Sequence, residues 1–156
     1  MKTQSAPARI AAIHAAARPV AADIIGGKLL RGPLFQFIGT SQAAATREAL
    51  RGEEGEAFAA ILARLADTIT TMPTSYQTDG RGRAAIAHLH YFRGGMDWYI
   101  TERDIDADGE GQVQAFGLAN LGYGAELGYI SLPEILAAGV ELDYHWSPRA
   151  LSAIAD

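Results

Sequence analysis

The chain has 156 residues, of which 49% are hydrophobic and 20% are charged, and it contains no cysteine. This composition excludes a wholly disordered chain, and the lack of cysteine excludes disulfides, thiolate metal sites and a cysteine nucleophile. Because no run of about eighteen apolar residues occurs, we expect a cytoplasmic protein that does not enter a membrane.

Charge is distributed unevenly along the sequence. The formal net charge is −5, yet residues 1–93 hold eleven Lys and Arg against seven Asp and Glu, whereas residues 94–156 hold two against eleven. The acidic half repels nucleic-acid phosphates and favours a basic partner, although a solvated acidic face accounts for the same charge. A nucleic-acid-associated factor is an alternative, using the scattered arginines Arg31, Arg47, Arg51, Arg81 and Arg83.

The first half of the chain is predicted to be helical. Short helices are expected after Ser5, from Pro19 to Ile25 with a stop at Gly26–Gly27, and from Ser41 to Gly52. The strongest helical pattern runs from Glu53 to Met72, where apolar residues recur in a single stripe: Phe58, Ile61, Leu62, Leu65, Ile69 and Met72. Such a stripe requires an apolar surface on which to pack.

From Ala84 onward the hydrophobic period changes to two, which predicts strands. The expected strands are Ala84–Phe92, Asp97–Glu102, Gln112–Leu118, Leu127–Ile130 and Val140–Trp146, with Arg93–Gly94–Gly95 as a hairpin turn. Ser131, Pro133 and Glu134 supply the cap, the first-turn proline and the reciprocal acid of a helix start. Ser147–Pro148 predicts a final short helix.

Short connections between these strands favour antiparallel pairing. We therefore expect an α+β fold, with an antiparallel sheet of about five strands in the C-terminal half and the helical N-terminal half packed on one face. The opposite face is expected to be free to meet another macromolecule. A single domain is predicted over residues 1–156, with a mainly helical part at 1–72 and a sheet part at 73–156.

Two histidines and a glutamate are the candidates for catalysis. His88 and His90 are two residues apart on a predicted strand, so both side chains point to the same face, near Glu102 on the neighbouring strand. Such a group suits zinc binding or acid–base chemistry, and a small hydrolase is therefore a further alternative. Ile86 and Phe92 share that face, which favours histidines partly buried under the helices.

The acidic loop after the second predicted strand resembles the first half of a calcium loop. Asp104, Asp106 and Asp108 alternate before Gly109, but the twelfth position is Ala115 and not the bidentate glutamate that such loops use. An Asp- and Gly-rich hairpin loop explains the same residues. Apart from weak calcium binding at these three aspartates, no metal or cofactor is expected.

Several segments of the second half together resemble a known family. They are Tyr76, His88–Phe92, Asp97–Glu102, Phe116–Gly117, Glu126–Glu134 and Leu142–Asp143. Over roughly residues 76–146, with an extension back to residue 50 left open, the chain is similar to the domain of unknown function 2958 family. These small proteins are encoded on plasmids, phages and integrative elements of bacteria. The resemblance implies an accessory protein of a mobile element and assigns no catalytic residue.

We therefore expect a non-enzymatic protein that binds a host or element-encoded protein, with an anti-defence or anti-restriction role by analogy. The residues expected to contact this partner are acidic and aromatic: Asp97, Trp98, Tyr99, Glu126 and Tyr129. Because side chains alternate along a strand, Trp98 and Tyr99 point to opposite faces, and one of them should be exposed.

Overall fold

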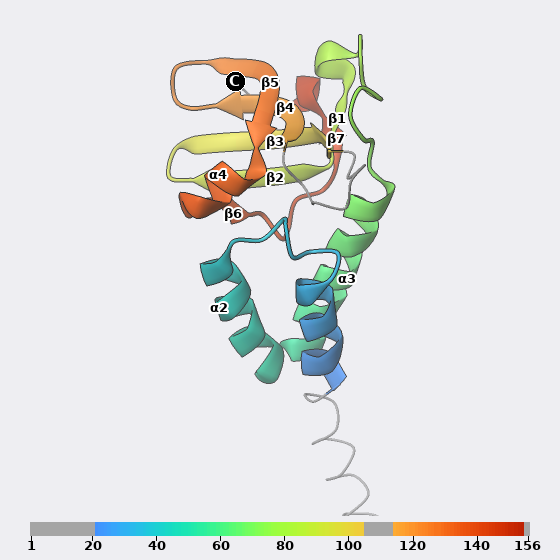
Figure 1. The fold of residues 1–156 in the computed structure, drawn as a ribbon, viewed down its shortest axis with the longest axis vertical. Helices are drawn as coiled ribbons and strands as arrows, with labels where there is room; N and C mark the ends of the chain where they lie inside the picture. The colour runs from blue at the N-terminus through green and yellow to red at the C-terminus, as the bar shows by residue number, and fades with distance from the viewer. Residues whose placement is uncertain (1–20, 105–113, 155–156) are drawn as a thin grey trace, which may run out of the picture.

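The structure, a computed structural model, describes residues 21–104 and 114–154. The helices before residue 72 gather at one end of the molecule and the sheet lies at the other, with α4 beside the strands (Figure 1). The fold is α+β, as predicted. The expected helix after Ser5 lies outside the described residues.

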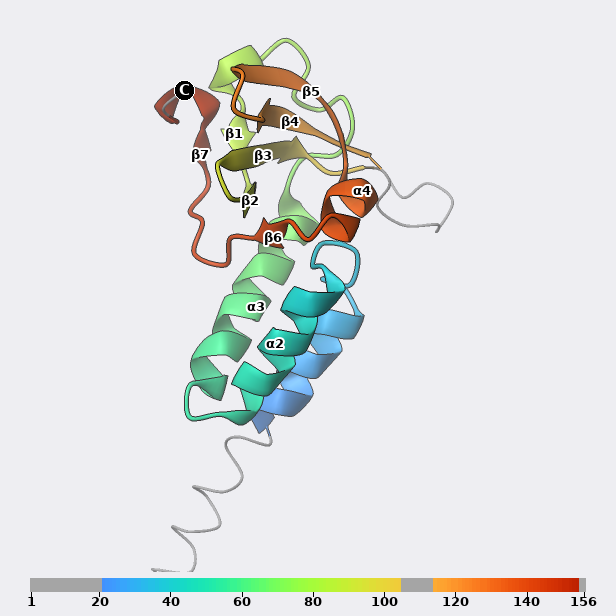
Figure 2. The same ribbon diagram turned by 90° about the vertical axis from the view of Figure 1, so that its left-hand side faces the viewer.

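The first described helix spans residues 21–31 and packs beside α2 (Thr40–Arg51) and α3 (Gly55–Thr71) (Figures 1 and 2). The predicted stop at Gly26–Gly27 is wrong. A Cβ atom on Gly26 would lie 2.4 Å from Cδ1 of Leu50, so this glycine permits close helix packing and does not end the helix. Gly52 follows the last residue of α2, as expected.

The predicted apolar stripe lies on α3 and faces the core. Leu62, Leu65, Ile69 and Met72 are buried, and the two N-terminal members of the stripe, Phe58 and Ile61, pack against the same core while partly exposed. The stripe is therefore what joins the helical layer to the sheet. No helix among the described residues is both long and apolar enough to cross a bilayer.

The main sheet has five antiparallel strands in the order β5-β4-β3-β2-β6. In chain order the strands are β2 (Leu89–Arg93), β3 (Met96–Glu102), β4 (Gln114–Asn120), β5 (Ala125–Ser131) and β6 (Glu141–Leu142). The predicted turn between the first two forms at Gly94, whose φ of 57° suits glycine. The predicted helix start is also confirmed, because Ser131 Oγ accepts from the Glu134 amide at the start of α4 (Leu132–Ala137).

The predicted strand Ala84–Phe92 is wrong in its first part. A 3₁₀ turn, η1 (Gly82–Ala84), precedes β1 (Ile86–Ala87), and the chain then leaves strand geometry at His88 before β2. Strand β1 pairs with β7 (Arg149–Ala150) in a separate two-stranded sheet. The alternating pattern therefore contains two short strands with different partners.

The predicted strand Val140–Trp146 is shortened to β6. The backbone amide of His145 donates to Oδ1 of Asp143 at 2.9 Å, which turns the chain away from the sheet. The predicted helix after Ser147–Pro148 is replaced by β7 and a 3₁₀ turn, η2 (Leu151–Ala153). Because Arg149 and Ala150 pair with β1, these residues form a strand in place of the predicted helix.

The two faces of the sheet differ in what covers them. On the inner face, Leu89 and Tyr91 join the core that the helices share, and the Tyr91 hydroxyl donates to the Phe37 carbonyl at 2.8 Å. On the outer face, Ala87, Trp146 and Leu151 cover Leu118 in a second, smaller core. The expectation of a free outer face is therefore wrong for its middle, because the chain folds its own C-terminal segment over it.

Candidate functional site

The outer face carries His90, contrary to the expectation that the helices bury this side chain. Leu89 and Tyr91 point toward the helices, so the alternation of β2 directs His90 and Phe92 to the opposite side. Ile86 and Phe92 are accordingly exposed. The hydrophobic pattern alone did not reveal which face the helices cover.

Two carboxylates hold the His90 ring from both sides. Its Nδ1 atom lies 3.0 Å from Oδ2 of Asp143, and its Nε2 atom lies 2.8 Å from Oδ1 of Asp97. Both ring nitrogens of His90 are therefore engaged by carboxylates of the protein's own fold. Through these contacts His90 links β2 to β3 and to the segment that follows β6.

Aromatic rings pack around this histidine. Tyr99 stacks on it with ring centroids 4.7 Å apart, and the Trp146 ring lies 5.0 Å away. The Arg149 guanidinium lies 4.0 Å from the Trp146 ring centroid, within cation–π range. Burial and then the Asp97 charge raise the pKa of Tyr99, and the Arg149 charge partly opposes them. The cluster ties β2 and β3 to the C-terminal segment.

Glu102, the third candidate for catalysis, is engaged elsewhere. Its side chain is buried, and it accepts from the Tyr76 amide at 2.9 Å and from the Thr78 amide at 2.7 Å. These bonds hold Tyr76 at a φ of 69°, a strained value for a residue with a side chain. His88 is half-buried, and burial lowers its pKa. Among the described residues, no hydrogen-bond network unites Glu102 with His88 and His90.

The five residues expected to contact a partner separate into three environments. Trp98 is only 7% exposed and belongs to the inner core, whereas Tyr99 and Asp97 belong to the His90 cluster. Glu126 and Tyr129 lie exposed on β5. Only the β5 pair thus presents its side chains freely to another molecule.

The predicted calcium loop is described only at its first member. Asp106 and Asp108 lie outside the described residues, and Asp104 accepts from the Ser75 hydroxyl at 3.1 Å and the Gln114 amide at 3.3 Å. Within residues 21–104 and 114–154, no three histidine, aspartate or glutamate side chains gather as metal ligands. Of the three aspartates only Asp104 is described, and its carboxylate is hydrogen-bonded to Ser75 and Gln114.

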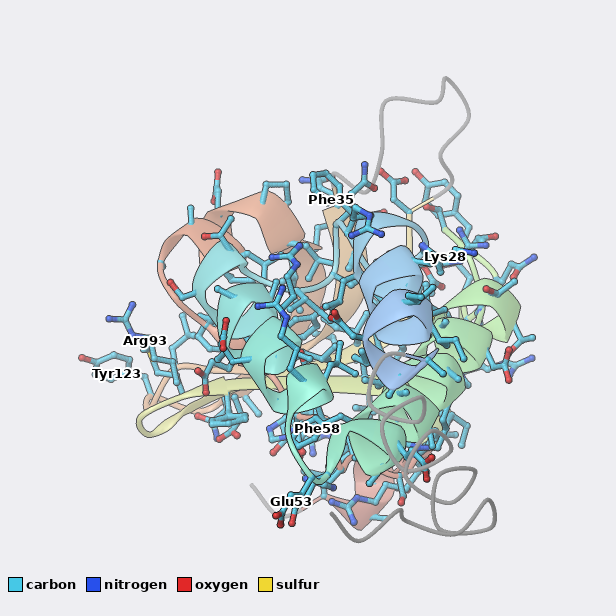
Figure 3. The ribbon with its side chains drawn as sticks, turned by 90° about the horizontal axis from the view of Figure 1, so that it is seen from below. Lys28, Phe35, Glu53, Phe58, Arg93 and Tyr123 are labelled. Atoms are coloured by element: carbon cyan, nitrogen blue, oxygen red, sulfur yellow. The ribbon has the colours of Figure 1, made fainter. Side chains whose placement is uncertain are left out.

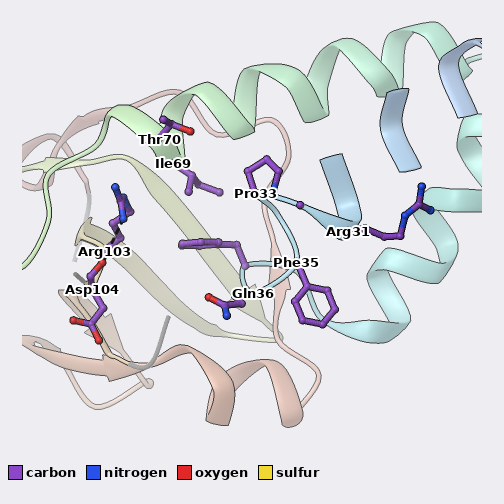
Figure 4. Close-up of a pocket in the computed structure, with 10 residues that line it drawn as sticks. Arg31, Pro33, Phe35, Gln36, Ile69, Thr70, Arg103 and Asp104 are labelled. Atoms are coloured by element: carbon purple, nitrogen blue, oxygen red, sulfur yellow. Dashed lines mark hydrogen bonds between the residues drawn. The ribbon is translucent and has the colours of Figure 1, made fainter. Parts of the chain in front are cut away.

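A hollow of about 390 Å³ lies between the turn after the first described helix and the end of α3. Figure 4 shows Arg103 and Asp104 on one side of it and Arg31 pointing away on the other. The Nε atom of Arg103 is buried, and no described residue forms a hydrogen bond with it. Arg31 and Arg103 do not point toward a common position, so they do not form an anion-binding site in this hollow. The described side chains that line it do not form a catalytic arrangement either.

The five arginines considered for nucleic-acid binding are also divided. Arg31, Arg47 and Arg51 lie in the helical layer, whereas Arg81 directly precedes η1 and Arg83 lies within it. Arg51 also lies within 4 Å of two carboxylates, those of Asp23 and Glu48. These five arginines therefore do not form a continuous basic stripe.

Strand β5 forms one edge of the sheet and lacks the usual edge protection. Its seven residues pair with β4 in unbroken register, and the strand contains no proline, no lysine and no bulge. Glu126 is the only charged residue between positions 114 and 131. Leu127 and Tyr129 are 41% and 58% exposed. Natural edge strands are normally short, bulged or charged, because an open edge pairs with other chains.

The tip of the β4–β5 hairpin extends this exposed surface. Tyr123 is 99% exposed, and Figure 3 shows it projecting from the same side of the molecule as Arg93. On the strand itself, the Tyr129 ring meets the Phe116 ring edge-on with centroids 5.4 Å apart. A hydrogen bond with Tyr76 raises the pKa of Tyr129, and the nearby charges of Asp79 and Glu102 raise it further.

Sequence reasoning missed Leu127, Asp79 and Asp143. Leu127 lies two residues before Tyr129 on the same face, so strand alternation contained the signal. Asp79 and Asp143 lie in loops, and nothing in their local sequence indicates which strand they approach.

The comparisons with known proteins do not extend this description: no family model, no curated protein and no solved structure matches the chain.

Proposed function

We propose that the protein is a non-enzymatic binding protein that recognises another protein by strand addition at the outer edge of β5. The observation that carries the proposal is the regular edge of this strand, which has one charged residue, Glu126, and no lysine, proline or bulge, next to the exposed side chains of Leu127 and Tyr129. An extended segment of a partner would continue the sheet through main-chain hydrogen bonds, and its alternate side chains would contact those two residues.

Two features of the chemistry favour binding over catalysis. The carboxylates of Asp97 and Asp143 occupy both nitrogens of His90, and the loop around Tyr76 and Thr78 occupies Glu102. Two of the three candidates for acid–base work, His90 and Glu102, therefore serve the fold. The side chains of Leu127 and Tyr129 on β5, in contrast, are 41% and 58% exposed and so leave surface for a partner to contact.

The biological setting of the proposal rests on the resemblance of residues 76–146 to the domain of unknown function 2958 family. By that resemblance, the protein is a cytoplasmic accessory protein of a bacterial mobile element, and its partner belongs to the host or to the element. An anti-defence or anti-restriction role is an analogy drawn from this setting.

Site-specific photo-crosslinking in cells of the source organism tests the proposal. A benzophenone side chain replaces Tyr129 in one variant and Phe35, which is exposed in the helical layer, in the control variant. We expect a discrete protein adduct from position 129 that Leu127→Lys abolishes, and no such adduct from position 35. Equal adducts from both positions, or none from position 129, would contradict strand addition at β5.

A further inference from the structure

A hollow of about 360 Å³ opens on the outer face beside β5. Phe116, Leu127 and Ala85 form its apolar part, and the loop carrying Asp79, Gly80 and Gly82 forms its rim. The volume is at the lower end of the range of about 300 to 1,000 Å³ for small-molecule pockets, which suits one long side chain. A strand added to β5 would direct every second side chain to this face.

Asp79 is the one carboxylate available at this rim. It forms no hydrogen bond or ion pair through its side chain with another described residue. Glu102 is buried beneath it and is already bonded to the Tyr76 and Thr78 amides. Arg81 and Arg83 belong to the same loop but do not line the hollow. The hollow therefore combines an apolar floor with an unpaired negative charge at its mouth.

These features fit a basic side chain. The aliphatic stem of lysine or arginine packs on apolar side chains such as Phe116 and Leu127, while its charged end stays at the polar mouth. There it meets the Asp79 carboxylate, and the ring of Phe116, which also lines the hollow, favours a cation further. An acidic side chain in the same place would meet Asp79 with a like charge.

We infer that the segment added to β5 carries a lysine or arginine at an outer-face position and that this side chain enters the hollow and pairs with Asp79. The inference rests on the proposed function and names the chemistry of the partner. A second copy of the chain does not fit, because residues 94–156 hold two basic against eleven acidic residues and self-pairing would bring two acidic halves together.

Three synthetic peptides test the inference by fluorescence anisotropy. Each is an extended segment of alternating threonine and valine, with arginine, threonine or glutamate at its central outer-face position. We expect the arginine peptide to bind about three- to fivefold more tightly than the neutral one, as for a partly exposed ion pair, and this advantage to shrink with added salt. The glutamate peptide should bind most weakly.

The Asp79→Lys variant should reverse the order, so that the glutamate peptide binds more tightly than the arginine peptide. The matched control is Asp67→Lys, which makes the same charge change at an exposed position of α3 and should keep the wild-type order. Unchanged circular dichroism shows that both variants are folded.

Equal binding of all three peptides, weakened by Leu127→Lys, would leave strand addition intact and overturn the role of Asp79. Reversal of the order by Asp67→Lys as well would also overturn it, because net charge alone would then explain the preference. Failure of all three peptides to bind would contradict both the inference and strand addition.

Discussion

The two edges of the main sheet differ in whether other parts of the chain form hydrogen bonds with their backbone. At the β6 edge, the Gln42 side chain from α2 donates to the Leu142 carbonyl at 2.8 Å and accepts from the Leu142 amide at 2.9 Å, as a neighbouring strand would. Strand β6 itself is only two residues long. At the β5 edge, seven residues run in regular register, and among described residues no loop backbone hydrogen bonds to that edge.

This difference indicates which edge is available to another chain. A free edge exposes backbone donors and acceptors that bind water or a further strand. The helical layer satisfies the β6 edge, and the polar bridge from His90 to Asp143 holds the chain that follows. The β5 edge receives no such cover in the described part of the chain, although it is the longer and more regular strand.

The largest expected effect compares two directly paired glycines. Gly117 on β4 pairs with Gly128 on β5, but a Cβ atom on Gly117 would lie 1.9 Å from the Tyr99 carbonyl oxygen, whereas one on Gly128 would meet nothing within 4 Å. Gly117→Ala should lower the free energy of unfolding by about 3 kcal/mol, and Gly128→Ala by less than about 1 kcal/mol. Urea unfolding of both variants measures this. Equal losses would mean that β5 is as enclosed as β4.

The next effect concerns the bridge that closes the β6 side. His90→Leu leaves the Asp97 and Asp143 carboxylates without the ring that contacts both of them, so the free energy of unfolding should fall by about 2 kcal/mol. The matched control is His145→Leu at an exposed position, which should change it by less than about 0.5 kcal/mol. If both variants unfold alike in urea, the bridge does not stabilise this side of the sheet.

A smaller effect is expected when the β6 edge is opened. Gln42→Ala removes both side-chain bonds to Leu142 and should lower the free energy of unfolding by about 1 kcal/mol, while Ser41→Ala on the exposed side of α2 should have little effect. Amide hydrogen exchange locates the change: the Leu142 amide is protected in the wild type and loses protection in Gln42→Ala. Rapid exchange at Leu142 in the wild type would contradict the contrast between the edges.

The smallest effect concerns His88, which directly precedes β2. Burial lowers the pKa of His88 below its ordinary value of 6.5, so protonation favours the unfolded chain. The stability that neutral His88 contributes is complete above pH 6.5 and is lost as the pH falls through its lower folded pKa. His88→Gln should therefore lose less stability than the wild type between pH values of about 7.5 and 5. Urea titrations at each pH measure the free energy of unfolding of both proteins. Equal losses in the wild type and in His88→Gln would mean that the His88 side chain is solvated.

Part of the candidate surface was predicted from sequence, and its organisation was not. Glu126 and Tyr129 are exposed on the edge strand. The alternation places Trp98 and Tyr99 on opposite faces, but neither ring is exposed as expected, because Trp98 joins the core and Tyr99 is half-buried against His90. The His90 ring is held by the carboxylates of Asp97 and of Asp143, which is 53 residues away. Sequence spacing carries no information on an approach of that kind, because it depends on how the strands are ordered.

By itself, the sequence determined the features whose cause is local. The apolar stripe of α3, the hairpin turn at Gly94 and the capped start of α4 at Ser131 each follow from residues within a few positions of one another. Only the tertiary structure decided where the alternating segments divide into strands and which edge is closed. Gln42 closes β6 from 100 residues away, and Ile86 of β1 pairs with Ala150 of β7, 64 residues further along the chain. Pairings over such distances depend on the free energy of the whole chain, since each one closes a long loop that only the assembled core stabilises.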